Sequence, residues 1–146
     1  MPTITRCSAA EFLAGVHPAP SREAVAIQIT DPCCAAPRAG DQYHALHHFE
    51  FTDTERASEL TGEFAINNDQ ARSIAVILRD ALAEGRDVVV HCQAGIYRSG
   101  GVAEAARRCG FDYVNRMERE SFASVFNHRV RDLVAINFYR LGERHA

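Results

Sequence analysis

The segment Val88–Gly101, which reads VVVHCQAGIYRSGG, decides the fold of this chain. Its three consecutive valines predict a strand covered on both faces, as in the centre of a parallel sheet. We expect this strand to end at His91, a loop to run from Cys92 to Arg98, and a helix to begin at Ser99. The sequence therefore predicts a strand–loop–helix unit with a cysteine at the start of the loop and an arginine at its end.

Apolar and polar stretches outside this segment alternate in a way that predicts further strands and helices. Strands are expected at 3–6, 24–30 and 45–51, and helices at 8–15, 67–85, 99–109 and, in one or two pieces, from 111 to 141. This order is typical of an α/β three-layer sandwich, whose central, mostly parallel sheet of four to five strands is flanked by helices. A chain of 146 residues is long enough for one domain, which we expect to span 1–146.

Helix boundaries carry their own signals. Ser8 with Glu11, and Asn67 with Gln70, have the spacing of a capping box. The last helix is expected to be capped by Asn127 or Ser121. Glycines are expected to end the first two helices, at Gly15 and Gly85.

Composition restricts the partners and the compartment. A net charge of −3 disfavours a general nucleic-acid binder, which would carry a basic stripe. No apolar run approaches the roughly 20 residues that span a bilayer, so we expect no membrane association. The start of the chain, MPTITRCSAAEF, lacks the pattern of a signal peptide. We expect a cytoplasmic protein that is a monomer.

The cysteines and histidines indicate neither a disulfide framework nor a metal site. The five cysteines are an odd number without a CxxC pair, and we expect free thiols at Cys7, Cys33, Cys34, Cys92 and Cys109. Cys33 and Cys34 are either an ordinary loop pair or redox partners of Cys92. On a strand, His44 and His48 would face one way and His47 the other, which disfavours a shared metal.

The loop after the central strand suits a sulfur nucleophile and an oxyanion. Backbone N–H groups at a helix start bind anions and favour a thiolate at Cys92. The planar guanidinium of Arg98 matches a phosphate in a bidentate way. Gly95 tolerates the backbone angles of a tight loop, and Ser99 can donate a hydrogen bond to the sulfur. His91 is expected to orient the loop rather than to carry a proton, and Tyr97 either shapes the pocket wall or packs.

The stretch His91–Ser99 matches the HCx5RS signature of the cysteine-based phosphatases. It has the HCxAGxxRS form that is common in their dual-specificity members. The chain thus resembles the cysteine-based protein tyrosine phosphatases, and in particular small bacterial or phage-type members. The similarity extends to a strand that ends in Asp-Pro (Ile29–Pro32), a Phe-x-Asp segment (Phe51–Asp53) and a helix before the signature (Asp69–Leu82).

This resemblance implies a phosphatase that acts on phosphotyrosine in proteins or peptides, with phosphoserine and phosphothreonine as further candidates. Cys92 would form a phosphocysteine, Arg98 would stabilise the transition state, and Ser99 would assist departure of the sulfur. No cofactor or metal is implied. The resemblance assigns phosphate binding to Gln93, Ala94, Gly95, Ile96, Tyr97 and Arg98.

The family also requires a general acid. Asp53 is our candidate because it follows a strand and matches the Phe-x-Asp pattern, although Thr52 stands where such members often have a further aspartate. The chain has no tryptophan, so the Trp-Pro-Asp loop of receptor-type members is absent. Glu50, Glu55 and Asp69 remain alternatives, of which Asp69 is better explained as a first-turn helix carboxylate.

Two other functions are compatible with an anion-binding cysteine loop. A rhodanese-like sulfurtransferase would also place a cysteine at the start of a helix but would not need Asp53. A catalytically weak phosphate-binding module would keep the loop and lack the acid. The loop interior holds no lysine, which disfavours inositol lipids as substrates.

Overall fold

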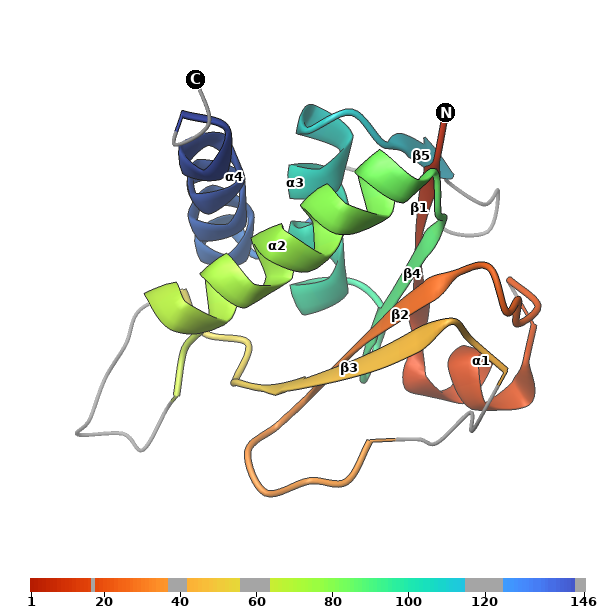
Figure 1. The fold of residues 1–146 in the computed structure, drawn as a ribbon. Coiled ribbons are helices and arrows are strands. Elements are labelled where there is room, and N and C mark those ends of the chain that lie inside the picture. Colours follow the sequence, from red (N-terminus) through yellow and green to blue (C-terminus); the bar gives the residue numbers. More distant parts are fainter. Residues whose placement is uncertain (17, 37–41, 56–63, 115–124, 144–146) are drawn as a thin grey trace.

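The computed structural model describes residues 1–16, 18–36, 42–55, 64–114 and 125–143. Within these ranges, helices separate the strands along the chain, except that the second and third strands have no described helix between them (Figure 1). The elements are β1 (Thr3–Ser8), α1 (Ala9–Ala14), β2 (Val25–Thr30), β3 (Ala45–Glu50), α2 (Asn68–Glu84), β4 (Val88–Cys92), α3 (Arg98–Arg108), β5 (Asp112–Val114) and α4 (His128–Glu143).

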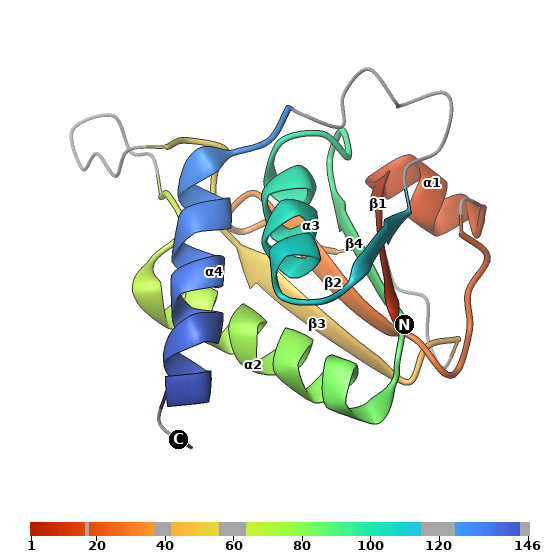
Figure 2. The ribbon, with the colours of Figure 1, turned by 90° about the horizontal axis from the view of Figure 1, so that it is seen from above.

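The strands form one sheet in the order β3-β2-β4-β1-β5, and every pairing in it is parallel (Figure 2). β4 lies in the middle and all its residues are buried, as its run of valines predicts. The expected α/β fold with a central sheet is therefore confirmed. Because the strands are parallel, all their carboxyl ends lie at the same edge of the sheet.

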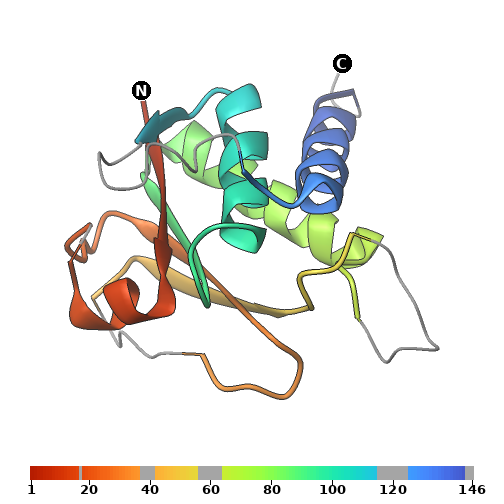
Figure 3. The same cartoon turned by 180° about the vertical axis from the view of Figure 1, so that it is seen from behind.

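The two faces of the sheet are covered unequally. Helices α2, α3 and α4 pack on one face, where the larger hydrophobic core contains Val88, Val90 and Cys92 of β4. The short helix α1 covers the other face, where Phe12 packs in a smaller core with Val89 (Figure 3). Successive residues of a strand point to opposite faces, so Cys92 points toward the three-helix side.

The predicted helix caps are present. Ser8 with Glu11 and Asn67 with Gln70 both form capping boxes. Gly15 and Gly85 end their helices in the left-handed conformation, each at φ +69°. Asn127 caps α4 by accepting a hydrogen bond from Val130 N at 3.0 Å. The alternative cap, Ser121, lies outside the described residues.

Several boundaries differ from the sequence predictions, and β1 extends beyond the predicted 3–6 to Ser8. β4 continues through Cys92, and α3 begins at Arg98. The helix expected from residue 111 onward is wrong at its start, where Asp112–Val114 form strand β5. This strand has no apolar alternation and is held by pairing with β1 at the edge of the sheet. Among the described residues, no helix combines the length and apolar character that crossing a membrane requires.

Candidate active site

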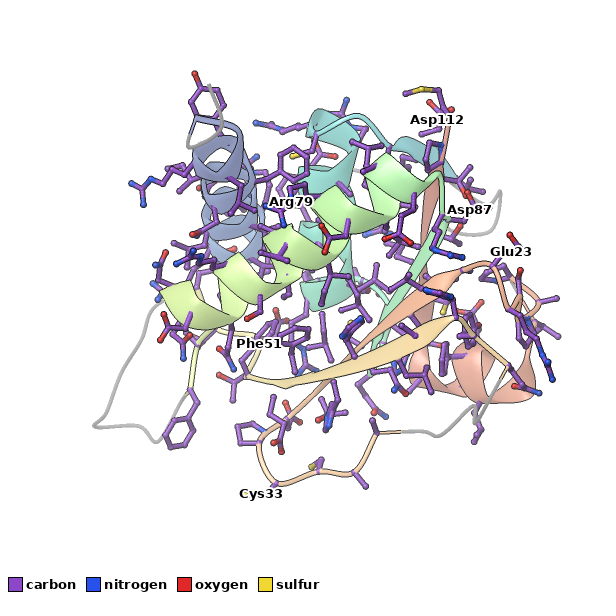
Figure 4. The ribbon with its side chains drawn as sticks, viewed as in Figure 1. Glu23, Cys33, Phe51, Arg79, Asp87 and Asp112 are labelled. Atoms are coloured by element: carbon purple, nitrogen blue, oxygen red, sulfur yellow. The ribbon has the colours of Figure 1, made fainter. Side chains whose placement is uncertain are left out.

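The residues predicted to carry chemistry gather at the carboxyl edge of the sheet. Ser8 and Cys92 are register partners at the ends of β1 and β4. The segments 31–36 and 51–55 follow β2 and β3 at the same edge. Figure 4 shows Cys33 and Phe51 toward this edge, whereas Asp87 and Asp112 lie toward the opposite end of the sheet.

Cys92 is the last residue of the central strand, and it is only 2% exposed. Its Sγ lies 3.2 Å from the hydroxyl oxygen of Ser99, which is itself fully buried near the start of α3. A hydroxyl at this distance can donate a hydrogen bond to a thiolate. The predicted pairing of these two residues is therefore brought about by the turn between β4 and α3.

The loop between Cys92 and Arg98 rests on the end of β1. Gly95 has φ +73°, and a Cβ added there would lie 2.5 Å from both Cys7 C and Ser8 N. Only glycine fits this position, because both the angle and the space exclude a side chain. The buried Arg6 of β1 also donates from Nη1 to the carbonyl oxygen of Ile96 at 2.9 Å. The loop is thus fixed from the neighbouring strand.

Arg98 is 6% exposed and is held by two acceptors. Its Nη1 donates to Asp31 Oδ1 and to the carbonyl oxygen of Phe51, both at 2.9 Å. These acceptors follow β2 and β3, so the carboxyl ends of two strands set the plane of the guanidinium. The Nε and Nη2 donors remain for an oxyanion such as phosphate.

Asp53 is exposed, and its Oδ1 accepts a hydrogen bond from Asn127 Nδ2 at 3.0 Å. The protein nevertheless covers part of the Asp53 carboxyl group, and this loss of solvation raises its pKa above the ordinary value. The Asn127 hydrogen bond and Arg98 oppose this effect, whereas the carboxylates Glu55 and Asp31 reinforce it. The raised pKa is a shift in the direction that favours a proton donor.

Two of the three alternative acids accept hydrogen bonds from backbone N–H groups. Glu50 Oε1 accepts from the backbone N–H of Cys33 at 2.6 Å, and Glu55 Oε1 accepts from that of His128 at 3.1 Å. Asp69 is exposed in the first turn of α2. These contacts give Glu50 and Glu55 structural roles, and Asp53 remains our candidate.

His91 points away from Cys92, toward α1. It is fully buried, its ring centroid lies 4.4 Å from that of Phe12, and its Nε2 lies 3.3 Å from Gln28 Oε1. Burial lowers the pKa of His91 to about 4, so its ring is neutral near pH 7. These contacts are with α1 and β2, and they support the strand that carries the loop.

The other candidate residues of the loop lie at or near the protein surface. Gln93, Ala94 and Tyr97 are exposed, and Ile96 is partly buried. Cys33 and Cys34 are exposed free thiols in the turn after β2. His48 Nε2 lies 2.7 Å from Thr30 Oγ1, and the described residues contain no group of three or more metal-binding side chains.

Three contributors were missed by sequence reasoning. Asp31 was interpreted only as part of a strand-ending Asp-Pro, Asn127 only as a helix cap, and Arg6 only as a strand residue. Asp31 had a usable signal, since a carboxylate directly after a parallel strand lies at the edge where Arg98 lies. Asn127 and Arg6 had none, because their partners are distant in sequence.

Comparison with known proteins supports the fold. No protein-family model matches the chain, and no curated protein matches its sequence. The crystal structure of human DUSP28 aligns with a TM-score of 0.55 and 16% identity over 99% of this chain and 96% of that one. That of human tyrosine phosphatase-like serine/threonine/tyrosine-interacting protein aligns with a TM-score of 0.54 and 13% identity over 99% and 94%.

The chain has the fold of these two proteins. The fold expected from the phosphatase resemblance is therefore confirmed. The second protein is named as phosphatase-like and as an interacting protein, so the fold by itself does not assign an activity. The activity has to be argued from the residues at the site.

Proposed function

We propose that this chain is a phosphatase that hydrolyses phosphotyrosine in proteins, with phosphoserine and phosphothreonine as further substrates. The observation that carries the proposal is the 3.2 Å contact between Cys92 Sγ and Ser99 Oγ, in a loop that ends at the buried and anchored Arg98. This arrangement supplies a nucleophile, a partner for its departure and a cation for the transferred group.

The first step forms a phosphocysteine. The Cys92 thiolate attacks phosphorus, and the bond from phosphorus to the ester oxygen breaks. Asp53 gives its proton to the departing oxygen, which leaves as the free hydroxyl of the substrate. Arg98 binds the phosphoryl oxygens through the donors that Asp31 and Phe51 do not occupy.

The second step releases phosphate. The Asp53 carboxylate takes a proton from water, the resulting hydroxide attacks phosphorus, and the phosphorus–sulfur bond breaks. The Ser99 hydroxyl stabilises the departing thiolate by donating a hydrogen bond. Inorganic phosphate leaves, and both Cys92 and Asp53 return to their starting states. The shared fold with human DUSP28 supports this assignment.

The test is hydrolysis of p-nitrophenyl phosphate by wild type, Cys92→Ser and Asp53→Asn from about pH 4.5 to about pH 8. Cys92→Ser should abolish turnover. Asp53→Asn should lower the rate by roughly 10²–10⁴-fold and remove the fall of activity at high pH. Turnover retained in Cys92→Ser would refute the proposal. An Asp53→Asn variant as active as wild type would keep the thiolate chemistry and leave Glu50, Glu55 or Asp69 as the proton donor.

A further inference from the structure

We propose that a cavity beside the loop from Cys92 to Arg98, the catalytic loop, binds an uncharged aliphatic side chain next to the phosphorylated residue of the substrate. This inference rests on the proposed phosphatase function and adds a substrate class to it. The cavity has a volume of about 330 Å³ and lies between α1 and the segment 31–36. Small-ligand sites begin at about 300 Å³, so the space is sufficient for one side chain.

Five of the eleven described residues that line this cavity are aliphatic. Ala9 and Leu13 contribute from α1, Ala35 and Ala36 from the segment after β2, and Ile29 from the end of β2 itself. Leu13 is 69% exposed, so its side chain is free to contact a group in the cavity. An aliphatic group placed in the cavity would cover part of this surface and remove it from water.

The cavity is continuous with the phosphate site but separate from the reacting atoms. Arg98 and Gln93 belong to the catalytic loop and also line the cavity. Cys92 and Asp53 are not among its described lining residues. We therefore place the scissile bond outside the cavity and assign a group inside it to another part of the substrate, such as a neighbouring residue of a peptide.

The charges at the cavity favour a neutral occupant. Of the described residues that line it, Arg98 is the cation, and its guanidinium is already paired with Asp31 at 2.9 Å. His91 is neutral near pH 7 because burial lowers its pKa to about 4. In the proposed mechanism the remaining donors of Arg98 bind the phosphoryl group, so the described lining residues offer no further cation for a second phosphate or an acidic side chain.

The experiment compares three phosphotyrosine peptides in which both flanking residues are alanine, leucine or glutamate. For wild type, kcat/KM should be roughly tenfold higher with leucine than with alanine, and lowest with glutamate. Leu13→Glu should bring the leucine and alanine peptides to similar values. Ala10→Glu is the matched control, because it adds the same charge to an exposed position of α1 that does not line the cavity.

Hydrolysis of p-nitrophenyl phosphate separates this proposal from the proposed function. Its kcat/KM should be the same in wild type, Leu13→Glu and Ala10→Glu, because this substrate has no flanking residue. Absence of this activity in wild type would overturn the phosphatase assignment itself. Normal activity together with equal rates for the leucine and alanine peptides, or a leucine preference that survives Leu13→Glu, would overturn only the cavity proposal.

Discussion

Replacement of Gly95 by alanine tests whether the catalytic loop is seated on β1. The left-handed backbone at φ +73° costs an alanine about 1–2 kcal/mol. The new Cβ would also lie 2.5 Å from Cys7 C and Ser8 N, which are backbone atoms that cannot rotate away. Overpacking of this kind costs about 1–3 kcal/mol. We therefore expect Gly95→Ala to lower the free energy of unfolding by about 2–5 kcal/mol.

Gly85→Ala provides the matched control. Gly85 also has a positive φ, of +69°, but a Cβ there would meet nothing within 4 Å. This variant should lose only about 1–2 kcal/mol and keep its activity. Urea unfolding followed by circular dichroism measures the free energy of unfolding of both variants. Hydrolysis of p-nitrophenyl phosphate measures whether displacement of the loop in Gly95→Ala lowers activity. If Gly95→Ala is no less stable than Gly85→Ala and hydrolyses the substrate at the wild-type rate, the reasoning is wrong.

Three further variants probe the contacts around the site. Asn127→Asp keeps an oxygen that caps α4 but replaces the amide donor to Asp53 with a carboxylate. It should therefore raise the pKa of Asp53 further and move the high-pH limb of the kcat/KM profile to higher pH. Asp31→Asn should lower kcat/KM about tenfold because it weakens the contact that positions Arg98. The free energy of unfolding should fall by less than about 1 kcal/mol, because Asp31 is exposed. Burial lowers the pKa of His91 from 6.5 to about 4. As the pH falls, His91 therefore becomes protonated in the unfolded chain before it does in the folded one. The free energy of unfolding should decrease as the pH falls from 6.5 to about 4. The loss should reach roughly 3 kcal/mol in urea unfolding and should be absent in His91→Gln.

The parts of the fold that sequence predicted are those whose signals are local. Each capping box is complete within three residues, and the glycines that end α1 and α2 follow directly. The central strand was predicted because three adjacent valines suit burial on both faces. The order of Cys92, Arg98 and Ser99 within one short loop likewise needed no tertiary information.

The parts that sequence did not predict depend on topology. Asp31 and Arg98 are 67 positions apart, and Asn127 and Asp53 are 74 apart. Each pair meets only because parallel strands end at one edge and α4 returns to it. Strand β5 escaped prediction because it has only three residues, which are too few to show an alternating apolar pattern.

The position of β4 between β1 and β2 has a consequence for synthesis of the chain. β1, β2 and β3 leave the ribosome first, but β1 pairs only with β4 and β5, so it cannot join the other two. Until residue 92 has been made, a growing chain carries unpaired strand edges, which are templates for pairing with other chains. The strand that ends in the nucleophile is therefore also the one that closes the sheet, and shortened chains that lack it should aggregate rather than persist as soluble fragments.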